Sequence, residues 1–133
     1  MAREDAAAIR RLKHEYCYTI DAGAYEEWVS LFTADGRFLQ YEDAVHEGHE
    51  GLAAFATGPF DDAYEHTAHV VTNPVVDVDG DEAVGRWYML LFYRDADGAT
   101  GWKQGAYEDR FRRVDGEWRI AEVDLAAGVT GDG

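Results

Sequence analysis

The spacing of apolar residues changes once along this 133-residue chain, from a helical period to a strand period. Apolar side chains recur every three or four residues over 4–20, 25–32 and 48–57, which predicts three amphipathic helices. A short alternating segment, 37–41, predicts a strand between the second and third helices. The second half is β-branched and aromatic, and short turns divide it into four predicted strands, over 66–78, 82–94, 101–114 and 118–125.

Helices gathered before an antiparallel meander predict an α+β fold. A strongly curved sheet with the helices over its concave face would enclose a pocket. The length fits one domain, 1–133, since two hydrophobic cores would not fit. Two breaks are predicted in the first half: a turn at Ala34-Asp35-Gly36, and the end of the third helix at Gly58-Pro59.

The charge of the chain excludes two classes of partner. Twelve Lys and Arg against 27 Asp and Glu give a net charge of −15. Nucleic acids and anionic membranes are both recognised through Lys and Arg, so neither is an expected partner. Only Lys13 and Lys103 are lysines. So many acids with so little lysine favour a halophilic, salt-adapted protein, although an ordinary acidic protein has the same sign of charge.

Compartment and redox state follow from three absences in the sequence. Cys17 is the only cysteine, which excludes an intrachain disulfide, and its apolar neighbours place it in the core. The first residues lack the apolar region of a signal peptide. No apolar stretch approaches the roughly 20 residues that cross a bilayer. We therefore expect a soluble, cytoplasmic protein.

Several short motifs follow one another at the spacing of a known family, over roughly 9–122. They are Tyr18-Thr19-Ile20-Asp21, Trp28-x-x-Leu31-Phe32-x-x-Asp35-Gly36-x-Phe38, Gly48-x-x-Gly51-Leu52-x-x-Phe55, His69-Val70-Val71-Thr72-Asn73-Pro74 and Gly105-x-Tyr107-x-Asp109-x-Phe111-x-Arg113. Together they resemble the SnoaL-like branch of the nuclear-transport-factor-2-like superfamily. Within it, the chain is most similar to the scytalone dehydratase, bile-acid dehydratase and lindane dehydrochlorinase group.

The resemblance implies a cone-shaped fold and an elimination that needs no cofactor. In that group a His–Asp pair in the cone removes the proton, and the corresponding residues here are His69 and Asp21. Tyr16 matches a tyrosine of the bile-acid-type enzymes, five residues before the aspartate. Tyr41 lies about one residue from the position of a tyrosine in scytalone dehydratase. The second pocket histidine of that enzyme falls near Trp87, so its substrate is not carried over.

These residue types suit the removal of a proton beside a carbonyl group. Imidazole titrates near neutral pH, and a carboxylate behind it fixes the tautomer and stabilises the imidazolium. Tyr16 would either protonate the departing hydroxyl group or hold a substrate oxygen. The residues predicted to bind substrate are Tyr41, Trp87, Tyr107, Asn73 and Phe55.

Each candidate also has a purely structural interpretation. His69 is a strand histidine that a backbone group would satisfy, and Asp21 precedes a helix that it would cap. Tyr16 lies on the apolar stripe and would be core. Asn73 shares a strand face with His69, which would turn it inward, or it satisfies the backbone beside Pro74.

No metal site is expected. His66 and His69 are three residues apart on a strand and face opposite ways. His46 and His49 fall in a predicted loop, at the pocket rim or in solvent. The remaining histidine, His14, is predicted to be exposed.

The outer face of the sheet is expected to carry an oligomer contact. Trp87, Met89, Leu91 and Tyr93 alternate with Tyr88, Leu90 and Phe92, so both faces of the 82–94 strand are apolar. One face would line the cone and the other would meet a partner, because an exposed apolar sheet invites association. We expect a homodimer or homotrimer through this face. The arginines of the next strand would bind an anionic substrate or pair with carboxylates: Arg110, Arg112 and Arg113.

The sequence thus favours a cofactor-independent lyase of the dehydratase type, acting on a small, mostly apolar cyclic substrate. One alternative is a proton transfer of the polyketide-cyclase or ketosteroid-isomerase type on the same fold. Another is a module that binds a small ligand without catalysis, since one fold serves many functions.

Overall fold

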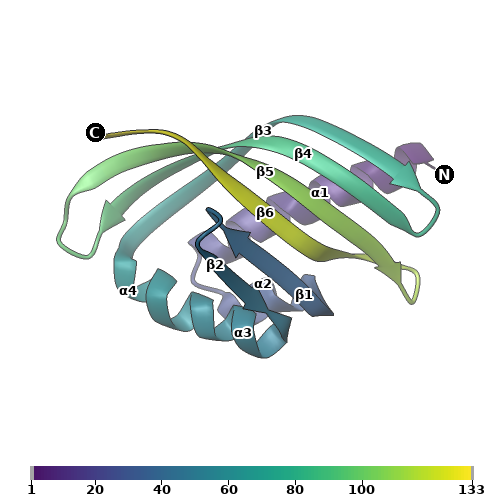
Figure 1. The fold of residues 1–133 in the computed structure, drawn as a ribbon, viewed down its shortest axis with the longest axis horizontal. Coiled ribbons are helices and arrows are strands. Elements are labelled where there is room, and N and C mark those ends of the chain that lie inside the picture. The colour runs from purple at the N-terminus through teal and green to yellow at the C-terminus, as the bar shows by residue number, and fades with distance from the viewer. Residues whose placement is uncertain (1, 133) are drawn as a thin grey trace.

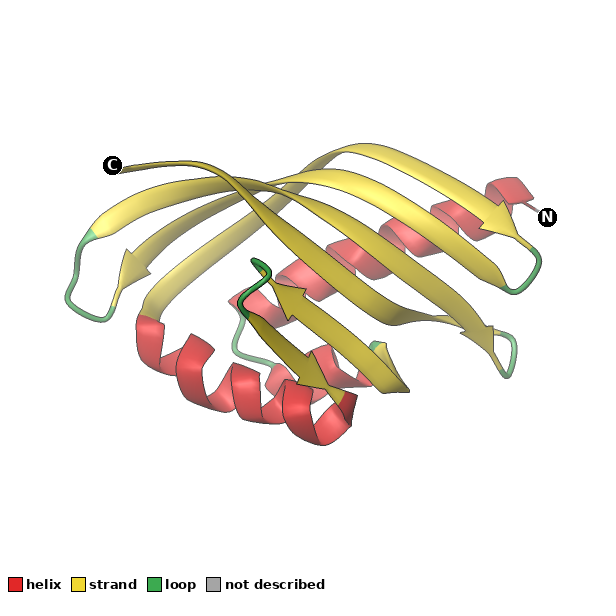
Figure 2. Cartoon of the chain, in the orientation of Figure 1, coloured by secondary structure: helices red, strands yellow, loops and turns green. Residues whose placement is uncertain are grey.

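A strongly curved sheet of six strands wraps over one long helix in the computed structural model, which describes residues 2–132 (Figure 1). The remaining helices lie on the same side of the sheet, where the helical segment over 48–63 runs from beneath the short strands at one edge to the start of the long strand at the other (Figure 2). Helices and sheet segregate into two layers, so the predicted α+β fold with helices over the concave face is confirmed.

The helices occupy the first half of the chain. They are α1 (Ala2–Asp21), α2 (Tyr25–Ser30), α3 (Gly48–Phe55), the π-helical turn η1 (Ala56–Phe60) and α4 (Asp61–Ala63). Helix α1 buries the predicted apolar stripe against the sheet, with Ile9 and Ile20 almost fully enclosed. No helix of the described residues is long and apolar enough to cross a membrane.

The strands form one mixed sheet in the order β2-β1-β6-β5-β4-β3. Only β1 and β6 run parallel; the other neighbours are antiparallel. The long strands β3 to β6 follow one another through tight turns and provide the curvature. The bounds are β1 (Phe32–Gln40), β2 (Ala44–Glu47), β3 (Tyr64–Asp79), β4 (Glu82–Asp95), β5 (Thr100–Val114) and β6 (Glu117–Asp132).

Two predicted breaks are wrong. The segment 34–36 is a bulge inside β1 and not a turn, and Gly36 is required there because a Cβ atom would lie 2.9 Å from Phe32 Cβ. The third helix does not end at Gly58-Pro59. The wider η1 turn carries the chain past Pro59, whose missing N–H would leave an α-helical hydrogen bond unmade.

Strand β2 is absent from the sequence-based prediction. It pairs with β1 through a turn in which Tyr41 and Glu42 both have positive φ, 54° and 64°, and the Asp43 N–H donates to Gln40 O. This is the geometry of a type I′ hairpin, which normally uses Asn or Gly at these positions. The local sequence therefore lacks the usual hairpin signal.

Candidate active site

A partly open cavity lies between the concave face of the sheet, α1 and the α3–η1 segment. Of the predicted residues it brings together His69, Tyr16, Tyr41, Tyr107 and Phe55. We call it the His69 cavity.

Asp21 does not line this cavity but lies against His69 of β3, because α1 ends beside that strand. Gly23 has φ 73°, and the Ala24 N–H donates back to Thr19 O, which closes the helix in a Schellman motif. The last helical residue, Asp21, therefore meets β3, where its carboxylate accepts three hydrogen bonds. The donors are Thr67 Oγ1 at 2.8 Å, the His69 backbone N–H at 2.8 Å and His69 Nδ1 at 2.6 Å.

The geometry fixes the chemical state of the imidazole. Because His69 Nδ1 donates to Asp21, the neutral ring carries its proton on Nδ1 and leaves the Nε2 lone pair available to accept a proton. The side chains of His69 and Asp21 are 9% and 19% exposed, so water competes little with this bond. His69 thus has a carboxylate partner, and Asp21 does not cap α2, whose N-cap is Ala24.

Tyr16 lies in the cavity wall above a buried charge pair. Its ring is 5.8 Å from that of Tyr107, and Lys13 Nζ lies 3.8 Å and 3.5 Å from the two ring centroids. Lys13 in turn is 3.0 Å from the carboxylate of Asp109, and neither side chain is exposed. Burial raises the pKa of both tyrosines well above the usual value, so both phenols stay protonated and can donate.

Two residues of the site were not identified from the sequence, the cation Lys103 and the hydroxyl-bearing Thr67. Lys103 lines the His69 cavity and donates from Nζ to Tyr64 Oη at 3.0 Å. Thr67 holds Asp21, and its position two residues before His69 on the same strand face was a signal for it. For Lys103 the only sequence signal was the scarcity of lysine.

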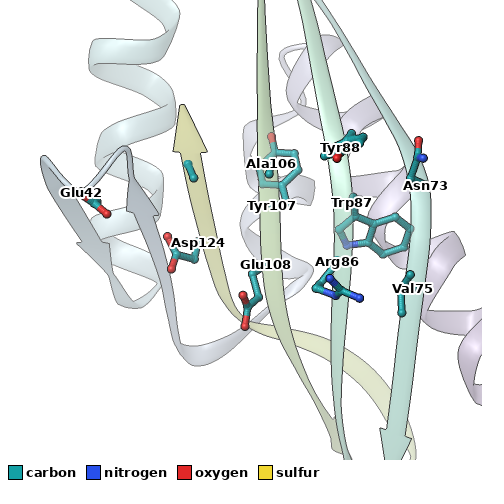
Figure 3. A pocket seen from close by; sticks show the side chains of 11 residues that line it. Glu42, Asn73, Val75, Arg86, Trp87, Tyr88, Ala106, Tyr107, Glu108 and Asp124 are labelled. Atoms are coloured by element: carbon teal, nitrogen blue, oxygen red, sulfur yellow. The ribbon is translucent and has the colours of Figure 1, made fainter. Parts of the chain in front are cut away.

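Two predicted substrate contacts lie elsewhere. Asn73 has φ 58° in a bulge between Thr72 and Val75, which breaks the alternation of β3, so the expectation that it faces inward is wrong. It is exposed and borders an open groove of about 420 Å³ on the outer face, with Tyr88 beside it on β4 (Figure 3). This groove contains no histidine, so its larger volume does not make it the candidate active site.

Trp87 does not line the His69 cavity either. His69 pairs with Leu91 of β4. Trp87 precedes Leu91 by four residues on that strand, so the Cα atoms of Trp87 and Leu91 lie about 13 Å apart at the rise of a strand. Its ring instead packs in the core, 6.5 Å from the ring of His14, which is itself exposed as predicted.

The other reactive side chains have structural partners. His46 Nε2 lies 3.2 Å from Gln40 Oε1 and His49 Nε2 lies 3.0 Å from Phe32 O, and within residues 2–132 no His, Cys, Asp and Glu cluster could hold a metal ion. Cys17 is buried, which raises the pKa of its thiol to about 12. The arginines of β5 pair with carboxylates, as one of the two interpretations predicted: Arg110 with Glu122, Arg112 with Asp35, Arg113 with Asp5 and Asp81.

Comparison with known proteins assigns the family. The model of the SnoaL-like domain matches residues 1–124, which is most of the chain. The chain belongs to the SnoaL-like domain family. The resemblance found from the motifs is therefore confirmed, and the nuclear-transport-factor-2-like fold with it. A search of the curated proteins returned no match.

Several solved structures superpose closely on this one. A protein of Novosphingobium aromaticivorans, provisionally assigned as an aromatic ring hydroxylase, is 26% identical, with 100% of this chain and 96% of that chain covered and a TM-score of 0.90. Another from the same organism, provisionally assigned as a scytalone dehydratase, is 25% identical, with 97% and 87% covered and a TM-score of 0.88. The hexachlorocyclohexane dehydrochlorinase LinA type 2 is 19% identical, with 98% and 89% covered, and its TM-score of 0.91 shows a shared fold.

Proposed function

We propose that the protein is a cofactor-independent lyase of the dehydratase type and that His69 is its general base. The observation that carries the proposal is the 2.6 Å hydrogen bond from His69 Nδ1 to Asp21, which leaves the rest of the imidazole beside a largely aromatic cavity. The similarity to a provisionally assigned scytalone dehydratase supports the same class of reaction. A module that only binds ligands would not need a carboxylate held by three donors behind an imidazole.

The proposed step conserves atoms and charge within the substrate and His69. Nε2 takes a proton from the carbon beside a carbonyl group, the C–H electrons form a C=C bond, and the C–O bond to the hydroxyl breaks. The imidazolium, stabilised by Asp21, then returns its proton to the departing oxygen, which leaves as water. Burial raises the pKa of Tyr16, so we assign to it a hydrogen bond to a substrate oxygen and not the loss of its proton.

The cavity limits the size of the substrate. The volume of about 60 Å³ is small beside the roughly 300–1,000 Å³ of typical small-molecule pockets. A small, mostly apolar hydroxy-carbonyl compound fits this volume. The predicted cyclic substrate would need a wider cavity, and Phe55 of α3 and Phe60 of η1 are among the side chains that narrow it.

The test measures proton removal directly. Small β-hydroxy ketones such as 4-hydroxy-2-butanone are incubated with the enzyme in D₂O, and NMR follows both deuterium uptake beside the carbonyl and formation of the alkene. We expect His69→Ala to lower both rates by at least about 100-fold, the lower end for a general base. The matched control, His66→Ala, removes an exposed imidazole of the same strand and should leave the rates within about twofold.

Each outcome bears on the proposal. If the activity survives His69→Ala within a few-fold, His69 is not the base. If deuterium enters without any alkene, the reaction is an isomerisation or cyclisation of the alternative type. If neither these ketones nor hydroxy-oxo acids of similar size exchange with the wild-type protein, the dehydratase assignment fails and a binding function takes its place.

A further inference from the structure

The His69 cavity contains an ammonium group that no carboxylate neutralises. Among the ion pairs of residues 2–132, Lys103 has no acidic partner within 4 Å, although the chain carries 27 acids. Lys13, the other lysine, is paired with Asp109. Lys103 is half-buried, and a cation removed from water in this way is normally paired.

Lys103 lies in the same row of the sheet as His69. His69 pairs with Leu91 on β4, and Leu91 pairs with Lys103 on β5, so the three side chains share one face and one level. Two strand spacings separate the Cα atoms of His69 and Lys103, about 10 Å. A small molecule that bridges the row over Leu91 reaches both side chains.

The surroundings of Lys103 keep it charged and leave it donors to spare. Partial burial acts to lower the pKa of Lys103, but the hydrogen bond to Tyr64 and the nearby phenol oxygens outweigh it, and the pKa lies above the usual value. One of the three N–H groups donates to Tyr64 Oη, which leaves two for a ligand. Tyr64 accepts from the lysine, so its own O–H is free to donate in addition.

We propose that Lys103 and Tyr64 form a carboxylate subsite and that the substrate is a small organic acid. The substrate carboxylate would lie on the ammonium and the phenol, and the reacting carbon would lie on the His69 side of Leu91. An ammonium with two free donors recognises a carboxylate through charge-assisted hydrogen bonds, and Lys103 is the one lysine or arginine among the described residues that line the cavity. The reactive part of this inference rests on the proposed function, but the binding part does not.

The experiment compares two probes that differ in charge and have the same shape. Isobutyrate and isobutyramide each have six non-hydrogen atoms, a size chosen because the cavity is small. The chain has only two lysines, so protein labelled with ¹³C at the lysine ε carbon gives one signal for Lys103 and an internal reference from the buried Lys13. Titration of each probe yields its dissociation constant from the Lys103 signal, and fluorescence of the cavity aromatics yields it for variants without Lys103.

We expect isobutyrate to bind at least about tenfold more tightly than isobutyramide, the factor of a charge-assisted hydrogen bond. The Lys103 signal should move and the Lys13 signal should stay. Lys103→Met should reduce the preference to within about threefold, and Lys103→Gln, which keeps a polar donor, serves in the same way if the Met variant is unfolded. The matched control is Arg11→Met, which removes one charge from a side chain 83% exposed on α1 and should keep the full preference.

Several results would overturn the subsite. These are equal binding of the two probes, no movement of the Lys103 signal at saturating isobutyrate, or an equal loss of preference in Arg11→Met and Lys103→Met. His69→Ala separates this proposal from the catalytic one, because it abolishes proton removal but should keep the isobutyrate preference. Loss of the preference in His69→Ala with retention in Lys103→Met would place the anion on the histidine and refute the assignment.

Discussion

Removal of the buried cation Lys13 should be among the most damaging single changes to this fold. Lys13 Nζ lies 3.0 Å from the Asp109 carboxylate, and both side chains are fully buried beneath Tyr16 and Tyr107. Lys13→Met keeps the length of the side chain but leaves a carboxylate without its partner. The free energy of unfolding should therefore fall.

The magnitude follows from the distance. At an effective dielectric constant near 20, two unit charges 3.0 Å apart attract by about 5–6 kcal/mol. Breaking a buried pair by removing one partner costs about 3–5 kcal/mol, because the remaining charge keeps its desolvation penalty. We expect Lys13→Met to lower the free energy of unfolding at pH 7 by about 3–5 kcal/mol. This is a large part of the stability of a small domain.

The pH dependence of the variant identifies the cause. Burial raises the pKa of Asp109 even with Lys13 present, and Lys13 is the largest influence that lowers it, so Lys13→Met raises this pKa further. When the pKa of a carboxyl is higher in the folded state than in the unfolded state, the protein loses stability as the pH rises from the unfolded-state pKa toward the folded-state pKa. The variant should therefore recover stability on acidification, by at most about 1.4 kcal/mol per pH unit.

Urea unfolding followed by circular dichroism at pH 6 and pH 8 measures these effects. Arg11→Met is the matched control on the same helix, since its weak, exposed pair with Glu15 at 3.9 Å should contribute less than about 1 kcal/mol. The double variant Lys13→Met with Asp109→Asn leaves no buried charge and should regain most of the loss. If Lys13→Met costs no more than Arg11→Met, or the double variant is as unstable as the single one, the pair does not act as described.

Two further predictions concern groups outside the cavity. The Cys17 thiol is buried with a pKa of about 12. Iodoacetamide at pH 8 should therefore label the native protein at under about 1% of the rate at which it labels the urea-unfolded protein, and rapid labelling of the native protein would contradict the burial. Tyr88 and Phe92 are 56% and 48% exposed on the outer face, and we predict a homodimer or homotrimer through it. In sedimentation experiments Tyr88→Glu and Phe92→Glu should each be monomers. Tyr18→Glu, a control at an exposed position on α1, should keep the wild-type oligomeric state. A monomeric wild-type protein would refute this interface.

The sequence predicted the long elements well because their apolar periods are strict. Helix α1 and strands β3 to β6 all lie where the patterns indicated, although most extend further, and β6 by seven residues beyond Leu125. The errors fall where the backbone leaves regular geometry. Tyr41 and Glu42 make a hairpin turn without Gly or Asn, and Asn73 sits in a bulge that reverses the side-chain alternation after it.

The candidate site divides in the same way. His69 and Asp21 came from motif spacing, and their placement depends on where α1 stops, which Gly23 signals locally. Lys103 was not predicted, because its role depends on pairing across three strands. No local sequence pattern indicates that Lys103 lies two strands from His69 at the same level of the sheet. That position is determined by the register of β3, β4 and β5.

The two lysines show how this acidic chain separates the uses of positive charge. Arginine holds carboxylates near the surface, as Arg113 does with Asp5 and Asp81, where its planar group binds several oxygens at once. Lysine occurs only inside, once against Asp109 and once in the cavity. A surface with this charge repels a small anion, so only a cation that faces the cavity can attract one. The scarcity of lysine, first a sign of salt adaptation, therefore makes Lys103 informative about the ligand.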